Sequence, residues 1–362
     1  MKRRLSIGLA LMLCAASLAG CAANEPDVSL GSTLAEPAQT ETADTEPEQE
    51  PAESVREETR QETPAPAEEA SVSEEDPVVY MTTDISPEGL MAIYEALGAQ
   101  LPEGNIAVKI STGENGSNYL RPELIGDLVQ AVDGTIVECN TAYGGDRANT
   151  AYHMQLAEDH GYTAIADVDI MDADGSMTLP VTGGTHLTEN YVGSHIENYD
   201  YIIVLSHFKG HTMAGFGGAI KNISIGIASS DGKSHIHSGG TGGNMWGGDQ
   251  DAFLEAMAEA AKSVVDYFGN GERALYINVM NRLSVDCDCD GSPAEPDMHD
   301  IGILASTDPV ALDQACIDLV YAAEDSASLI QRIESRNGLH TLEHTQEIGF
   351  GSREYTLVNI DE

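Results

Sequence analysis

From about residue 77 onward, short apolar runs alternate with amphipathic stretches. The run at 201–205 is β-branched and follows a polar segment, which indicates a buried strand. Similar runs predict strands at 78–80, 106–110, 135–137, 164–168, 274–279, 300–305 and 355–360. Helical periodicity and capping residues predict helices at 86–97, 121–132, 147–160, 251–268 and 308–320, with short helices near Leu329 and Glu343.

This alternation favours an α/β fold with a mostly parallel, doubly wound sheet. The stretch at 171–199 is less regular. The sequence leaves open whether the domain is one continuous body or two lobes joined by this stretch. In open sheets of this kind, ligands bind outside the carboxyl ends of the strands. We therefore expect a functional site in the segment that follows residues 201–205.

The preceding residues have a different composition. Residues 22–76 are rich in Glu, Pro, Thr and Ala, with 17 acidic and two basic side chains, which predicts a disordered linker. Residues 1–21 combine basic residues at 2–4, an apolar run at 5–18 and a Leu-Ala-Gly-Cys ending that resembles the bacterial lipobox. The sequence thus predicts a signal peptide (1–21), a linker (22–76) and an α/β domain (77–362). Lipidation of Cys21 would anchor the protein outside the cytoplasm.

The net charge of −43 limits the partners. Such a field repels nucleic acid and anionic membrane surfaces, so contact with the membrane is expected through the N-terminal lipid only. A small-molecule substrate or a metal ion remains compatible with the composition.

The segment 206–240 contains four of the eleven histidines and many glycines. Imidazole and amine groups on such a backbone suit proton transfer, metal ligation or a covalent lysine link, which makes His207, Lys209 and His211 candidate catalytic residues. The alternative is a glycine-rich surface loop with solvated histidines.

A second constellation is the sequence Asp-Cys-Asp-Cys-Asp at 286–290. Two thiolates beside carboxylates suit a soft or borderline metal, so Cys287 and Cys289 are candidate metal ligands or a redox dithiol. A disulfide between them, or bridges to Cys139 and Cys316, is the structural alternative. The sequence leaves both possibilities open.

A set of short segments carries a family resemblance: 138–145, 160–161, 206–211, 218–222, 286–289 and 301–313. Through these segments the chain from Lys109 onward resembles a family of uncharacterised proteins, domain-of-unknown-function family 362. Many members carry a ferredoxin insert with C-x-x-C-x-x-C runs, but this chain has the glycine-rich residues 238–248 in its place. No iron–sulfur cluster of that kind is therefore expected.

A further set of residues comprises His211, the Gly-Phe-Gly-Gly run at 215–218, Lys221, His237 and the segment 118–122. Through this set the chain has a more distant resemblance to the nickel-pincer lactate racemase family. The resemblance implies that His211 is a proton-transfer base, that Lys221 anchors a cofactor and that His237 binds a transition metal such as nickel. His211 is also a candidate metal ligand. Asn222, Gly217, Gly218 and Arg121 would then contact the cofactor, and His153 or His186 would be the partner acid.

Three hypotheses follow from the sequence. The first is an envelope-anchored protein with a metal- or cofactor-dependent site, performing oxidoreductase- or isomerase-like chemistry on a small polar substrate. The second is a lipoprotein that binds a metal or ligand without catalysis. The third is a redox partner that uses Cys287 and Cys289 as a dithiol.

Overall fold

The computed structural model of the chain describes residues 76–99, 101 and 103–361. The predicted signal peptide, the lipidated Cys21 and all but the last residue of the predicted linker lie outside the described residues. Within the described part, none of the helices combines the length and apolar character that crossing a bilayer requires.

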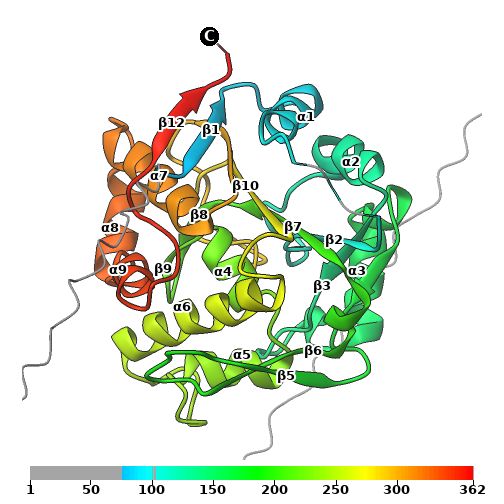
Figure 1. Cartoon of the computed structure of the whole chain (residues 1–362), viewed down its shortest axis with the longest axis vertical. Coiled ribbons are helices and arrows are strands. Elements are labelled where there is room, and N and C mark those ends of the chain that lie inside the picture. The colour runs from blue at the N-terminus through cyan, green and yellow to red at the C-terminus, as the bar shows by residue number, and fades with distance from the viewer. Residues whose placement is uncertain (1–75, 100, 102, 362) are drawn as a thin grey trace, which may run out of the picture. The chain divides into compact units, whose positions relative to one another are not determined.

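An eight-stranded sheet forms the centre of the described residues (Figure 1). Across the sheet the strands are β12 (Thr356–Asn359), β1 (Val78–Thr82), β11 (Gly302–Ser306), β10 (Ala274–Met280), β7 (Tyr201–His207), β2 (Ile106–Lys109), β3 (Gly134–Glu138) and β4 (Val168–Ile170). The five strands from β10 to β4 are parallel, while β11 runs antiparallel to both of its neighbours. The predicted α/β fold with a mostly parallel sheet is therefore confirmed.

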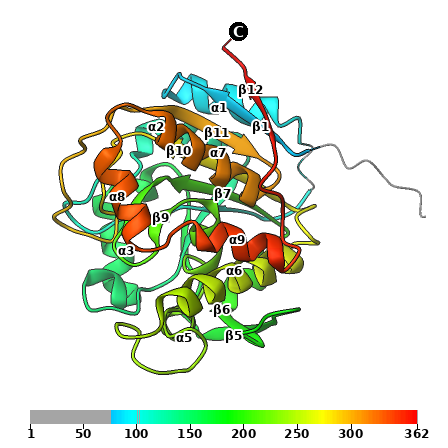
Figure 2. The same ribbon diagram turned by 90° about the vertical axis from the view of Figure 1, so that its left-hand side faces the viewer.

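Helices cover both faces of the sheet, as the turned view shows (Figure 2). The position of β7 explains why residues 201–205 are apolar. Ile203 and Leu205 pack with helices α1 (Pro87–Ala96) and α2 (Pro122–Ala131), while Ile202 and Val204 pack on the other face. That second face is covered by α4 (Ala219–Ser224), α6 (Gln250–Tyr267) and α7 (Pro309–Ala322). Burial on both sides is the usual origin of a continuous apolar strand.

The predicted helix starts have a local cause. Ser86 accepts a hydrogen bond from the backbone N–H of Gly89 at 3.1 Å and so caps α1, and Asp308 caps α7 in the same way. Each helix then has proline at its first position, where the missing N–H leaves no unmet hydrogen bond.

The predicted strand at 164–168 is wrong. Helix α3 (Thr150–Asp159) is followed by Gly161, whose φ of 90° is left-handed. The chain then forms the 3₁₀ turn η2 (Tyr162–Ala164). Strand β4 begins only at Val168. The apolar residues before β4 belong to a turn and not to a strand, because Gly161 redirects the chain after α3.

The less regular region 171–199 contains a hairpin of β5 (Ser176–Pro180) and β6 (Glu189–Gly193) and the turn η3 (Ser194–Asn198). The contacts join the described residues into one compact unit, so this hairpin does not begin a second lobe. The remaining elements are η1 (Asp146–Ala148), β8 (Lys209–His211), β9 (Gly215–Gly217), α5 (Ser230–His237), α8 (Ala327–Ser335) and α9 (His340–Glu347). The glycine-rich segment 206–240 is therefore mostly regular structure and mostly buried, unlike a solvated loop.

Candidate functional site

A cavity of about 630 Å³ opens at the carboxyl ends of β2, β3 and β7. The chain runs from β2 outward through β3 to β4, and then returns to place β7 on the other side of β2. The strand order therefore reverses between β2 and β7, which is where ligands bind in doubly wound sheets. Asn222 spans this point, donating from its amide to the carbonyl oxygens of Lys109 and Leu205 and to the hydroxyl of Ser206.

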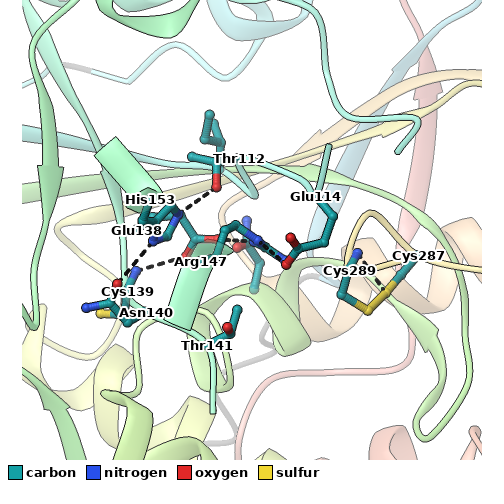
Figure 3. A network of polar contacts seen from close by, with 12 residues as sticks. Thr112, Glu114, Glu138, Cys139, Asn140, Thr141, Arg147, His153, Cys287 and Cys289 are labelled. Carbon is teal, nitrogen blue, oxygen red and sulfur yellow. Dashed lines mark hydrogen bonds and ion pairs between the residues drawn. A yellow bond between two sulfur atoms is a disulfide. The ribbon is translucent and has the colours of Figure 1, made fainter. Parts of the chain in front are cut away.

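A buried network of charges forms one wall of the cavity (Figure 3). Glu138 lies 3.0 Å from the ammonium of Lys109 and 3.3 Å from the guanidinium of Arg147, which also pairs with Glu114 at 2.8 Å. Burial alone would raise the pKa of Glu138, but the charges of Lys109 and Arg147 hold this pKa at about 2. The charges of the four side chains thus compensate one another.

The sequence interpretation missed these four residues. The available signal was the position of Lys109 and Glu138, each a charged residue that ends an otherwise apolar strand. Glu114 and Arg147 come from loops, and no sequence pattern links them to each other. Lys233 lies on α5 within the segment 206–240 and was not among the predicted site residues; it lines the cavity and donates to the carbonyl oxygen of Ala228 at 2.6 Å.

His237, at the last turn of α5, has a defined tautomer. Its Nδ1 lies 2.7 Å from the carbonyl oxygen of Lys233, an acceptor, so Nδ1 carries the proton. Nε2 then holds a lone pair, and the ring lines the cavity while it stacks on Phe253. Burial lowers the pKa of His237 to about 4, so the ring is neutral at physiological pH. His237 can accept a proton or bind a metal through Nε2.

His211 has the opposite tautomer. Its Nδ1 accepts hydrogen bonds from the backbone N–H groups of Met213 and Ala214 at 3.2 and 2.9 Å. Burial, followed by the charge of Lys221, lowers the pKa of His211 well below its ordinary value, so the ring is neutral with its proton on Nε2. This geometry favours His211 as a hydrogen-bond donor and disfavours the predicted roles of base and metal ligand.

Lys221 lies on the third residue of α4 and lines the cavity. Its ammonium has no hydrogen bond or salt bridge with any described residue, although Lys109 nearby has three polar contacts. Burial and then the charge of Lys109 lower the pKa of Lys221 to about 8. An amine with such a pKa and no partner is suited to holding an anion or to forming a covalent bond.

Gly218 is required by packing. An added Cβ atom would lie 2.2 Å from Oδ1 of Asp313, which accepts hydrogen bonds from the N–H groups of Ala219 and Ile220. This buried carboxylate fixes the first turn of α4 and therefore the position of Lys221. Gly217, the neighbouring residue, lines the cavity.

The fold places His207 and Lys209 beside Asp288, the residue between Cys287 and Cys289 in the sequence. Lys209 Nζ lies 2.6 Å from Oδ1 of Asp288, and His207 Nδ1 lies 3.0 Å from Oδ2. Burial alone would raise the pKa of Asp288, but His207 and Lys209 hold it below the ordinary value. The predicted catalytic pair thus anchors the 286–290 loop at the cavity wall.

Cys287 and Cys289 are joined by a disulfide on that wall. Together with His211 they form the one group of three or more His, Cys, Asp or Glu side chains in the described part of the chain whose ligand atoms all lie within 4.8 Å of one another. In the oxidised state neither sulfur is a thiolate, so the metal-ligand prediction for the two cysteines applies to the reduced protein only.

Three predicted residues lie away from the cavity lining. The guanidinium of Arg121 sits 3.9 Å above the ring of Tyr119. His153 is enclosed next to the charged network, with Nε2 2.8 Å from the hydroxyl of Thr112, and burial lowers its pKa to about 3 (Figure 3). His186 pairs with Glu255 on α6 at 2.5 Å. None of the three contacts the cavity lined by His211, Lys221 and His237.

Comparison with known proteins identifies the family. Residues 106–318 match the family described as a domain of unknown function (DUF362). The chain belongs to this family. No curated protein sequence matches.

Two solved structures are similar in part. One is the lactate racemase apoprotein from Thermoanaerobacterium thermosaccharolyticum, with 14% identity, a TM-score of 0.38 and coverage of 67% of this chain and 56% of that one. The other is a protein from Thermotoga maritima, with 14% identity, a TM-score of 0.37 and coverage of 66% and 58%. The chain spans less than two thirds of either length, and likeness of this extent does not specify an activity.

Proposed function

We propose that the cavity binds a small organic anion and that Lys221, His211 and His237 act on it. The observation that carries this proposal is the ammonium of Lys221, which has no partner among the described residues. Burial lowers the pKa of both histidines, and the charge of Lys221 lowers it further. A buried cation without a counter-ion is unfavourable in the empty protein. A carboxylate or phosphate in the cavity would remove that penalty.

The distribution of charge supports an anionic ligand. Five of the twelve lysine and arginine side chains in residues 76–361 line this one cavity, in a chain whose net charge is −43. Lys109, Arg147 and Lys209 are paired with carboxylates. Lys221 and Lys233 have no salt bridge within the described part of the chain, so a free divalent cation would be repelled there unless an anionic ligand accompanied it.

The two imidazoles supply complementary chemistry. His237 presents a lone pair that accepts a proton, and His211 presents an N–H that stabilises negative charge on a ligand oxygen. An acceptor and a donor around one anion are what proton transfer on a small hydroxy or oxo acid needs. We therefore propose isomerase- or oxidoreductase-like chemistry as the reaction class.

A bound cofactor fits part of this donor set. Lys221 offers a reactive amine for a covalent link, and His237 offers one imidazole lone pair for a transition metal, nickel included. Such a group would supply the hydride acceptor that redox isomerisation of a hydroxy acid requires. Attachment to the membrane through Cys21 also remains part of the proposal.

The first test uses Trp246, the one tryptophan of the chain, which lines the cavity and is 63% exposed. Small carboxylates should change its fluorescence saturably, and neutral amides of the same shape should not. Lys221→Met should weaken anion binding about tenfold or more, while the control Lys262→Met on α6 should not. Equal binding of anions and amides, or no effect of Lys221→Met, would refute the proposal.

The second test is intact mass and metal analysis of protein from its native envelope. A mass addition mapped to Lys221 with stoichiometric metal would support a cofactor-dependent enzyme. Metal without an adduct would favour the binding role without catalysis. Anion binding with neither would leave acid–base chemistry by the two histidines alone.

A further inference from the structure

The disulfide on the cavity wall has no part in the chemistry proposed above. Cys287 and Cys289 are partly exposed and line the cavity, whereas Cys139 and Cys316, the other cysteines of the described residues, are buried free thiols. Burial raises the pKa of Cys139 to about 12 and that of Cys316 well above its ordinary value, so neither thiol is reactive. Thiol chemistry in this region is therefore confined to one accessible pair.

The two sulfurs of the pair are not equivalent. The backbone N–H of Cys289 donates to Sγ of Cys287 at 3.2 Å. A donor of this kind stabilises a thiolate, so Cys287 is the better leaving group when the disulfide is attacked. An incoming nucleophile should consequently react at Sγ of Cys289. A ring nitrogen of His211 lies within 4.8 Å of both sulfurs, and the neutral ring has its N–H at Nε2.

The acidic neighbours of the disulfide do not exclude an anion. Asp288 is neutralised by Lys209 and His207, and Asp286 pairs with Arg332 at 3.1 Å. Two of the three carboxylates in the 286–290 loop are thus compensated. Within the described residues, Lys221 and Lys233 are the cavity-lining cations without a salt bridge, and they line the same cavity as the two sulfurs.

We propose that this disulfide exchanges with a small anionic thiol that enters the cavity; the choice of an anion rests on the proposed function. A thiolate attacks Sγ of Cys289, the bond between the two cysteines breaks, and its electron pair leaves on Cys287. A second thiolate attacks the sulfur of the bound thiol and releases Cys289 as a thiolate. Two thiols are oxidised to one disulfide, the protein gains two electrons, and the two protons of the thiols pass to the cysteines.

The experiment follows reduction of the oxidised full chain by intact mass, as a gain of two hydrogens. The probes are 3-mercaptopropionate, 2-mercaptoethanol and cysteamine, which carry negative, no and positive charge, with rates compared per thiolate. We expect 3-mercaptopropionate to react about tenfold faster than cysteamine. This preference should disappear in Lys221→Met and persist in Lys262→Met, two variants whose folding is checked by circular dichroism.

Acid quenching at early times and peptide mapping should place the first mixed disulfide on Cys289. A mixed disulfide on Cys287, rates independent of thiol charge, or a disulfide that resists all three thiols would each overturn the inference. Anion-dependent fluorescence of Trp246 in the Cys287→Ser/Cys289→Ser double variant separates the two proposals. If the double variant keeps this fluorescence signal while the unaltered protein shows no exchange, only this inference is wrong. If the signal and the exchange are both absent, the proposed function is wrong as well.

Discussion

The amine of Lys221 should be far more reactive than that of an ordinary lysine. Its pKa is lowered from 10.5 to about 8, by burial first and by the charge of Lys109 second. At pH 7 about one amine in ten is then neutral, against about one in three thousand for an unperturbed lysine. The structure therefore predicts about a 300-fold larger neutral fraction at this one position.

The assay is pulse labelling of the folded protein with a small uncharged acylating reagent between pH 6 and 11, with peptides quantified by mass spectrometry. The labelling midpoint of Lys221 should lie near pH 8. Because the charge of Lys233 also lowers this pKa, Lys233→Met should move the midpoint upward. A midpoint near 10.5 in the unaltered protein would refute the reasoning, as would a midpoint that Lys233→Met leaves unchanged.

The same shift fixes the direction of a pH effect on binding. The protonated ammonium attracts an anion and the neutral amine does not. Affinity for small carboxylates should accordingly be full below pH 8 and fall as the pH rises through that value, measured by titration of Trp246 fluorescence. A constant affinity between pH 7 and 10 would exclude Lys221 as the anion-binding group.

The remaining predictions concern stability and location. Asp288→Asn leaves the buried ammonium of Lys209 without its counter-ion and removes the carboxylate that contacts His207, and it should lower the free energy of unfolding in urea by about 3–5 kcal/mol. Because the pKa of Glu138 falls from 4.5 to about 2 in the fold, stability should be full above pH 4.5 and decline toward pH 2, less steeply in Glu138→Gln. Gly218→Ala places a Cβ against Asp313 and should destabilise by about 1–3 kcal/mol, seen as a lower Tm. Cys21→Ser should move the protein from the membrane fraction to the soluble fraction, and unchanged fractionation would exclude the lipid anchor.

Part of the candidate site could be predicted from the sequence because it follows directly from one strand. The apolar residues of β7 identify a buried strand, and the parallel topology places the segment after it at the carboxyl edge. His211, Lys221 and His237 are within 30 residues of one another and line one cavity. The charges that surround them come from other strands and loops, and no short-range pattern connects these residues.

The chemical role of each histidine could not be predicted, since it depends on which backbone group each ring nitrogen meets. Nδ1 of His211 meets two N–H donors and Nδ1 of His237 meets a carbonyl oxygen, so two rings of identical composition have opposite tautomers. His207 resembled them in sequence, yet it is committed to Asp288, which is 81 residues away.

By itself, the sequence determined the α/β class, the helix starts at Ser86 and Asp308 and the segment that carries the candidate site. These properties depend on periodicity and capping within a few residues, which the chain specifies locally. Only the tertiary structure decided that Cys287 and Cys289 are bonded, that Glu138 is neutralised by Lys109 and Arg147, and that Lys221 has no partner among the described residues. Such pairings depend on distances between remote segments after burial, when the loss of water makes each charge require a specific neighbour.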